Sequence, residues 1–137
     1  MKRNLATRRL DSTLVLRQGA AEPTDEEWNE LLGALEDLHR TTGEVKFLVV
    51  TDGGGPSPPQ RKRLGEALGG QNFRVAVVTD SVKARFVSAA VALFNPNTQA
   101  FTRAELPSAY KFLGISEREQ ELATAAISDL TALIQES

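Results

Sequence analysis

The chain has 137 residues, the usual length of one domain, and 41% of them are hydrophobic, which excludes a disordered chain. The 16 basic and 18 acidic residues give a net charge of -2, so composition gives no general reason to expect nucleic acid or an anionic membrane as partner. The absence of cysteine and the single histidine exclude disulfides, thiolate catalysis and cysteine or multi-histidine zinc sites. Because no apolar run is long enough to span a bilayer, we expect one cytoplasmic domain over 1–137, with no metal and no cofactor.

The first part of the chain predicts a β-hairpin and a helix. Alternating residues over 5–9 and the run over 13–17 are typical of two strands joined by a short turn. Thr24 and Glu27 have the spacing of a capping box, and the apolar residues that follow recur every three or four positions, which predicts one buried face of a helix. We expect this helix to end at Gly43.

Two buried strands, each followed by a helix, are predicted next. The apolar runs over 45–50 and 73–78 are typical of strands that are covered on both faces, as in a parallel sheet. Helices are predicted over 60–68 and over 82–94. The first is polar, whereas the second carries apolar residues on several faces and is therefore expected to be covered on more than one side.

The last part of the chain predicts a short strand over 98–102, a short helix that ends at Leu113, and a long helix to about Ile134. Ser116 and Glu119 have the spacing of a second capping box at the start of the long helix. The resulting order is β-β-α-β-α-β-α-β-α with an extra C-terminal helix. It predicts an α/β fold whose central sheet of about five strands is mixed and mostly parallel.

Four patterns follow one another between residues 73 and 114: a strand that ends in a polar turn (74–80), a helix start (84–86), a last strand (100–102) and a closing helix (105–114). Together with the helix and strand of residues 27–50, they resemble the STAS superfamily. Within it, they are most similar to the SpoIIAA-like branch, whose folds are also compared with the lipid-binding domains of phosphatidylinositol-transfer proteins. The resemblance implies a core over 1–114, a C-terminal helical extension over 115–137, and a regulatory module that acts by binding.

The resemblance also directs attention to one strand-to-helix turn. In the anti-anti-sigma members of the superfamily, a phosphorylatable serine follows an aspartate at this turn. The matching aspartate here is Asp52, which is followed by Gly53 instead of serine. Thr51 and Ser57 are the hydroxyls that remain nearby, and they are the candidate phosphorylation sites if the chain is a phospho-switched anti-sigma antagonist.

The loop of residues 51–59 is the first candidate binding site. Gly53, Gly54 and Gly55 permit close approach of the backbone, and open α/β sheets bind ligands at loops that leave the carboxyl ends of parallel strands. Asp52, these glycines and Ser57 would then contact a ligand or a partner. The alternative is that the loop is only a flexible connection.

The helix over 82–94 is the second candidate, with Phe86 and Phe94 as its largest apolar residues. One interpretation is a surface for a partner or for a second copy of the chain, and another is one wall of an apolar-ligand pocket lined by Phe86 and Phe94. The alternative is a core helix packed under the C-terminal helix.

Asp52 and Asp80 each follow a predicted strand and are expected at the same edge of the sheet. Paired carboxylates there would bind a cation or perform acid–base chemistry, whereas aspartates in such positions more often cap the next helix or its loop. We expect no catalytic residue and no enzyme, since no serine, cysteine or histidine motif accompanies them.

The sequence therefore predicts a non-catalytic binding or regulatory module that acts through protein–protein interaction in bacterial-type signalling. Its partner is expected to be a protein, with loop 51–59, Asp80 and the helix over 82–94 forming one recognition surface and a second copy of the chain as a further possible partner. A carrier or sensor of a small apolar ligand or lipid is the main alternative. A hydrolase that uses Asp52 and Asp80 is the third hypothesis.

Overall fold

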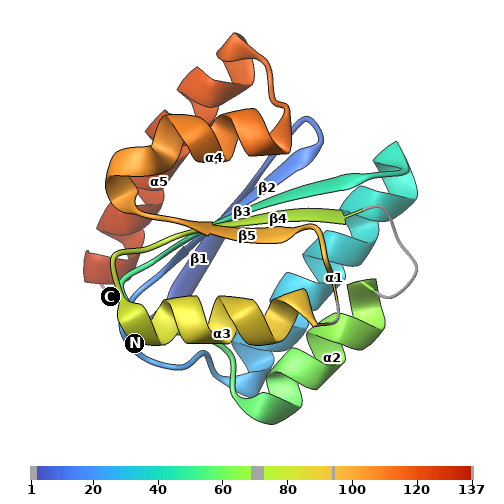
Figure 1. The fold of residues 1–137 in the computed structure, drawn as a ribbon, viewed down its shortest axis with the longest axis vertical. Helices are drawn as coiled ribbons and strands as arrows, with labels where there is room; N and C mark the ends of the chain where they lie inside the picture. The colour runs from blue at the N-terminus through green and yellow to red at the C-terminus, as the bar shows by residue number, and fades with distance from the viewer. Residues whose placement is uncertain (1–2, 69–72, 94, 137) are drawn as a thin grey trace.

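The computed structural model describes residues 3–68, 73–93 and 95–136. These residues form an α/β fold in which a five-stranded sheet lies between two layers of helices (Figure 1). The strands are β1 (Leu5–Leu10), β2 (Thr13–Gln18), β3 (Val45–Thr51), β4 (Phe73–Val78) and β5 (Thr98–Phe101). The helices are α1 (Asp25–Thr42), α2 (Pro58–Leu68), α3 (Val82–Ala92), α4 (Leu106–Leu113) and α5 (Glu117–Glu136), with a 3-10 turn at Arg103–Glu105. This order of elements confirms the predicted one.

The strands lie side by side in the order in which they occur along the chain. β1 and β2 form an antiparallel hairpin, and β2, β3, β4 and β5 are parallel to one another. Phe47 is paired with Val75 and Val49 with Val77, so the two apolar runs are neighbours in one sheet, as predicted. The four parallel strands all end at the same edge. We call this the carboxyl edge, and it consists of residues 19–23, 52–57, 79–81 and 102–105.

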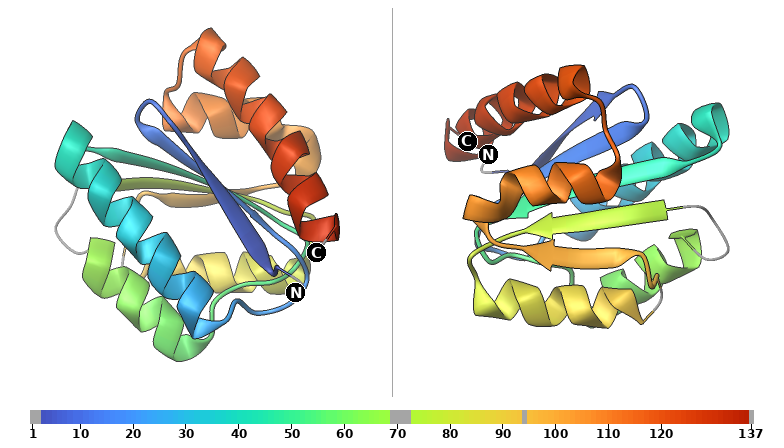
Figure 2. Two further views of the ribbon diagram at one scale, coloured as in Figure 1. Left: turned by 180° about the vertical axis from the view of Figure 1, so that it is seen from behind. Right: turned by 45° about the horizontal axis from the view of Figure 1, so that its top comes forward.

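The helices are divided between the two faces of the sheet (Figure 2). α1, α2 and α3 cover one face, and α4 and α5 cover the other. The division follows from topology. Each of the three connections joins a parallel strand to its next neighbour in the same direction, and right-handed crossovers then place all three helices on one face. α4 and α5 come after the last strand and are free to close the opposite face.

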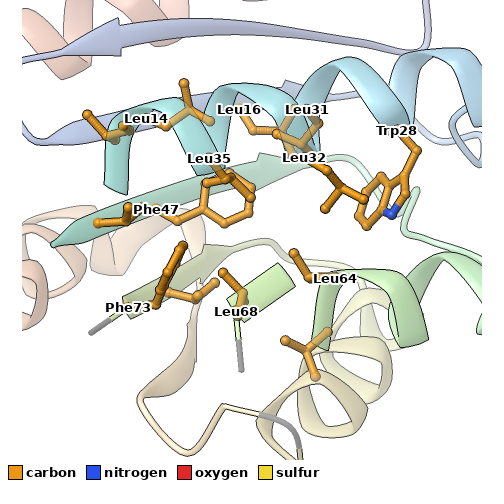
Figure 3. Close-up of a cluster of buried hydrophobic side chains, with 14 of the residues drawn as sticks. Leu14, Leu16, Trp28, Leu31, Leu32, Leu35, Phe47, Leu64, Leu68 and Phe73 are labelled. Atoms are coloured by element: carbon orange, nitrogen blue, oxygen red, sulfur yellow. The ribbon is translucent and has the colours of Figure 1, made fainter. Parts of the chain in front are cut away.

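The first hydrophobic core lies between the sheet and α1–α3. Alternate residues of the strands point into it because side chains alternate across a sheet. In Figure 3, Leu35 of α1 lies beside Phe47, and Trp28 lies next to Leu32 at the other end of the cluster from Phe73. The indole Nε1 of Trp28 donates a hydrogen bond to the carbonyl oxygen of Gln60 at 2.9 Å, which joins α1 to α2. The buried members of this core are Leu5, Leu14, Leu16, Trp28, Leu31, Leu32, Leu35, Leu38, Val45, Phe47, Leu64, Leu68, Phe73, Val75, Val77 and Val91.

The second core lies on the opposite face, and α5 supplies much of it. Ala123, Ala126, Leu130 and Ile134 are buried against strand residues such as Val15. α5 packs on β1 and β2, so residues 117–136 cover a face that the strands alone would leave apolar and exposed. Within the described residues, no helix is both long and apolar enough to cross a bilayer.

The two predicted capping boxes have different outcomes. Thr24 and Glu27 form a complete box, with the Glu27 amide donating to Thr24 Oγ1 at 3.1 Å and the Thr24 amide donating to Glu27 Oε1 at 2.8 Å. At the start of α5, the Glu119 amide donates to Ser116 Oγ at 3.2 Å, which is half of the second box. The Glu119 carboxylate instead accepts from the buried Thr13 hydroxyl at 2.6 Å, because that hydroxyl has to be satisfied inside the second core.

Candidate functional site

The loops of the carboxyl edge are bound to one another. The Asp52 amide donates to the carbonyl oxygen of Gln18 at 3.0 Å, and the Gly54 amide donates to that of Gly19 at 2.9 Å. A Cβ atom at Gly54 would lie 2.3 Å from the carbonyl oxygen of Ala21, so only glycine fits this crossing of two backbones. The start of loop 51–59 thus packs against the backbone of residues 19–21.

Loop 51–59 also lies against α3. Gly53 has a φ of +132°, and a Cβ atom there would lie 3.3 Å from Ser81 Oγ, which caps α3. A Cβ atom at Gly55 would lie 3.2 Å from Val87 Cγ1. Glycines at these positions therefore allow the loop to approach the first turns of the helix. The predicted adjacency of this loop and this helix is confirmed. The three glycines face other residues of the same chain, where the sequence analysis expected a ligand or a partner.

Asp52 is held by two arginines that the sequence analysis did not select. The Nη2 atom of Arg17 lies 2.9 Å from Oδ1 and 3.0 Å from Oδ2 of Asp52. The Arg17 side chain is only 4% exposed, whereas that of Asp52 is 43% exposed. Arg103 Nη1 lies 3.6 Å from Asp52 Oδ1. The charge of Asp52 is therefore compensated by the buried Arg17 and by the more exposed Arg103.

Asp80 lies at the same edge, as predicted, and its Oδ1 atom accepts a hydrogen bond from the Arg103 amide at 3.0 Å. A polar hollow of about 310 Å³ lies between the loops, lined by Thr51, Asp52, Asp80, Ser81 and Arg103. In the described part of the chain, no group of three or more histidine, aspartate or glutamate side chains is placed to hold a metal ion. Both aspartates thus contact arginines from other parts of the chain, and neither has the expected alternative role of capping the next helix, since Ser57 and Ser81 accept the capping hydrogen bonds at α2 and α3.

The two candidate hydroxyls for phosphorylation also have structural contacts. Thr51 is 3% exposed, and its Oγ1 atom donates to the carbonyl oxygen of Gly54 at 2.7 Å. Ser57 precedes α2, where its Oγ atom accepts from the Gln60 amide at 3.4 Å and its amide donates to Gln60 Oε1 at 3.0 Å. A kinase would reach Thr51 only after the loop opened.

An apolar cavity lies between α3, α2 and the sheet, but it holds only about 50 Å³. Pockets for small-molecule ligands usually hold about 300–1,000 Å³. On the α3 side its wall is made by Ala84, Val87, Ser88 and Val91. The prediction that Phe86 lines such a pocket is wrong, because Phe86 lies about 200° around the helix from Ala84 and from Ser88. Phe94 lies outside the described residues.

The outward face of α3 carries an exposed apolar stripe. Val82, Phe86 and Leu93 are 67–85% exposed, and Ala89 is exposed between them. We call these four residues the α3 seam. Their successive spacings of four, three and four residues place them in one line along the helix. This line lies opposite the buried residues Ala84, Ser88 and Val91. The described residues include two other exposed large apolar side chains, Leu122 and Leu133, which are 41% and 46% exposed at the margin of α5.

The structure thus brings together Asp52, Gly53, Gly54, Gly55, Ser57 and Asp80 at the carboxyl edge and places Phe86 on the adjoining seam. The sequence analysis missed Arg17, Arg103, Val82 and Leu93 as parts of this region. A signal for Arg17 exists, since it is a charged residue that directly follows the apolar run Leu14–Val15–Leu16. The chain matches no family model, no curated protein and no solved structure.

Proposed function

We propose that the chain is a non-catalytic binding module, and that it recognises a partner protein through the α3 seam with loop 51–59 at its rim. The observation that carries this proposal is the exposure of Val82, Phe86 and Leu93 on one helical line. Burial of a side chain of this size contributes about 1.5–3 kcal/mol, a contribution that the isolated chain forgoes at three positions. Large apolar side chains clustered in this way are typical of protein–protein interfaces.

The region around the seam is suited to binding because it is rigid. Loop 51–59 is fixed to the 19–21 backbone by the Gly54 contacts, and its glycines pack on the first turns of α3. Three small or β-branched side chains, Ala84, Ser88 and Val91, anchor the other face of α3 in the core. A partner would therefore meet a preformed surface, which lowers the entropic cost of association.

We further propose a distant relationship to the SpoIIAA-like branch of the STAS superfamily, and with it a role in bacterial-type signalling. The order of elements and the sequential, mostly parallel sheet support this relationship. A phosphorylation switch is not part of the proposal, because the Thr51 hydroxyl is buried and Ser57 caps α2.

The other two hypotheses have less support. A hydrolase would need Asp52 as a free base or cation ligand, and both of its carboxylate oxygens accept hydrogen bonds from Arg17. A lipid carrier would need a cavity several times larger than the one beneath α3.

The proposal is tested by affinity capture from extracts of the source organism with the full chain as bait. Three baits are compared: the natural chain, Phe86→Ser, and the matched control Leu133→Ser on the opposite side of the sheet. We expect one or more proteins to be retained by the natural chain and by the control at similar levels and to be lost with Phe86→Ser. Identical sets of captured proteins with all three baits would refute a role for the seam.

A further inference from the structure

The charges beside the α3 seam are all positive on the helix itself. At 100° per residue, Lys83 lies on one side of the seam and Arg85 on the other, and both are exposed. α3 contains no acidic residue between Val82 and Ala92. The seam is thus an apolar line with one cation on each flank in its N-terminal half.

We propose that the occupant of the α3 seam is an amphipathic helix of a different protein, whose apolar stripe is flanked by acidic residues. This inference rests on the proposed function and specifies the chemistry of its partner. The four-three-four spacing of the seam is that of two helices packed along a shared apolar line, where charges on the flanks select the partner. Glutamate or aspartate on the flanks of the incoming helix would face Lys83 and Arg85.

A second copy of this chain fits the seam less well. Two parallel α3 helices would bring Lys83 and Arg85 of one copy beside those of the other. Two antiparallel helices would place these cations beside Ala90 and Ala92, which offer them no negative charge. In neither arrangement does α3 of one copy place an acidic side chain beside Lys83 or Arg85 of the other.

An anionic membrane also fits less well. Protein surfaces that recognise anionic lipids usually carry a cluster of about 4–8 basic residues, and the flanks of the seam carry two. The positive charge of Arg85 is partly offset by Glu105. Hydrogen bonds from the Thr102 amide and hydroxyl lower the pKa of Glu105, and the charge of Arg85 lowers it as well. Because Arg85 already interacts with Glu105, we expect Lys83 to make the larger contribution to partner choice.

The test uses a displayed library of three-heptad helices with leucine fixed along the apolar stripe and with Glu, Gln or Lys allowed at the flanking positions. The immobilised target is the full chain. We expect Glu to be enriched over Lys by about two- to five-fold at each flank, the range for exposed ion pairs. The Lys83→Glu, Arg85→Glu double variant should reverse this preference, and Lys83→Glu alone should weaken it more than Arg85→Glu alone.

The arms of the experiment separate the two proposals. Enrichment of helices by the natural chain but not by Phe86→Ser, without any charge preference, would overturn the inference on acidic flanks and leave the seam as a binding surface. No enrichment above the level of Phe86→Ser would overturn the inference of a helical occupant, whereas the proposed function is overturned by identical sets of captured proteins with the natural chain and Phe86→Ser. Two further results would also overturn the inference. One is binding of the natural chain to phosphatidylcholine–phosphatidylglycerol vesicles that Phe86→Ser abolishes. The other is a dimer of the natural chain in sedimentation equilibrium that Phe86→Ser abolishes.

Discussion

The guanidinium of Arg17 is buried beneath α5, and its Nη2 atom donates to both carboxylate oxygens of Asp52, at 2.9 and 3.0 Å. Its Nε atom donates to Thr131 Oγ1 at 2.8 Å, and its Nη1 atom donates to the carbonyl oxygen of Gln18 at 2.6 Å. One side chain of β2 thereby joins the start of loop 51–59 to the C-terminal helix. This connection adds to the backbone hydrogen bonds from Asp52 and Gly54 that hold the start of the loop.

The Arg17–Asp52 pair should respond unequally to the loss of its two members. Asp52→Ala leaves a buried cation without its anion, and we expect it to lower the free energy of unfolding by about 3 kcal/mol. Arg17→Met should cost about 1 kcal/mol, because methionine fills the space of the stem and the remaining acceptors keep other partners. The carbonyl oxygen of Gln18 still accepts from the Asp52 amide, and the Thr131 hydroxyl donates to the carbonyl oxygen of Ile127. Urea denaturation monitored by circular dichroism measures both values.

The double variant provides the control for this prediction. Once Arg17 is methionine, the removal of the Asp52 carboxylate no longer strands a buried charge. The Arg17→Met, Asp52→Ala protein should therefore be more stable than Asp52→Ala alone. A larger loss for Arg17→Met than for Asp52→Ala would contradict the dependence of the guanidinium on this carboxylate.

Gly54 and Gly33 should respond in opposite directions to alanine. A Cβ atom at Gly54 would lie 2.3 Å from the carbonyl oxygen of Ala21 and 2.6 Å from that of Gly19, and neither backbone atom can move without displacing the loop. We expect Gly54→Ala to lower the free energy of unfolding by about 2 kcal/mol or more. Gly33 lies on the exposed side of α1 with nothing within 4 Å of a Cβ atom, so Gly33→Ala should raise it by about 0.5–1 kcal/mol.

Thermal unfolding of the two glycine variants beside the natural chain measures this contrast. Equal stability of Gly54→Ala and the natural chain would mean that loop 51–59 is free to move away from the 19–21 backbone.

Phe86 should contribute almost nothing to the stability of the isolated chain. Its side chain is 73% exposed, and phenylalanine and serine have similar helix propensities, so Phe86→Ser should change the free energy of unfolding by less than about 0.5 kcal/mol. Val91 lies on the opposite, buried face of the same helix, and Val91→Ala should cost about 2 kcal/mol. The comparison is made by urea denaturation. A marked loss with Phe86→Ser would mean that the residue packs within the chain and that its binding phenotype is not specific.

Much of the fold follows from short-range patterns in the sequence. The runs over 45–50 and 73–78 predict buried strands because, apart from Lys46 and Arg74, they are apolar, and strands covered on both faces carry few polar positions. The capping box at Thr24 and the left-handed Gly43 mark both ends of α1, since a cap is a local hydrogen-bonding requirement that adjacent residues meet. Alternation with crossover helices then predicts that these strands are parallel, whereas their sequential order in the sheet comes from the structure.

The features that the sequence does not predict depend on contacts between distant residues. Glu119 has the spacing of a capping residue, yet its carboxylate binds Thr13, which is 106 positions away. Arg17 is buried because Asp52 and α5 come to it from other parts of the chain. α3 is apolar around most of its circumference, and such a pattern cannot tell which face the sheet will cover. The exposure of Phe86 is therefore visible only once the small residues Ala84 and Ser88 are seen in the core.

The Glu27 carboxylate should make the stability of the chain depend on pH below about 5. Burial raises the pKa of Glu27, but hydrogen bonds from the Thr24 amide and from the amide and side chain of Asn4 together lower it below its ordinary value of 4.5. A carboxylate with a lowered pKa in the folded state contributes stability that is complete above the unfolded pKa and is lost as pH falls through the folded one. We therefore expect Glu27→Gln to lower the free energy of unfolding by about 1 kcal/mol at pH 7, and the difference from the natural chain to shrink between about pH 5 and pH 3.

Urea denaturation at half-unit steps of pH measures this difference, with Glu26→Gln as the control that removes an exposed charge from the same helical turn. Glutamine retains one oxygen acceptor for the Thr24 amide, so the variant keeps the shape of the cap and loses mainly the titrating group. Because Glu27 accepts from Asn4 as well, the effect should exceed that of Glu26→Gln, which alters only the interaction with the helix dipole. Parallel loss of stability by Glu27→Gln and the natural chain below pH 5 would show that other carboxylates govern acid unfolding and that the charge of Glu27 adds nothing to the folded state.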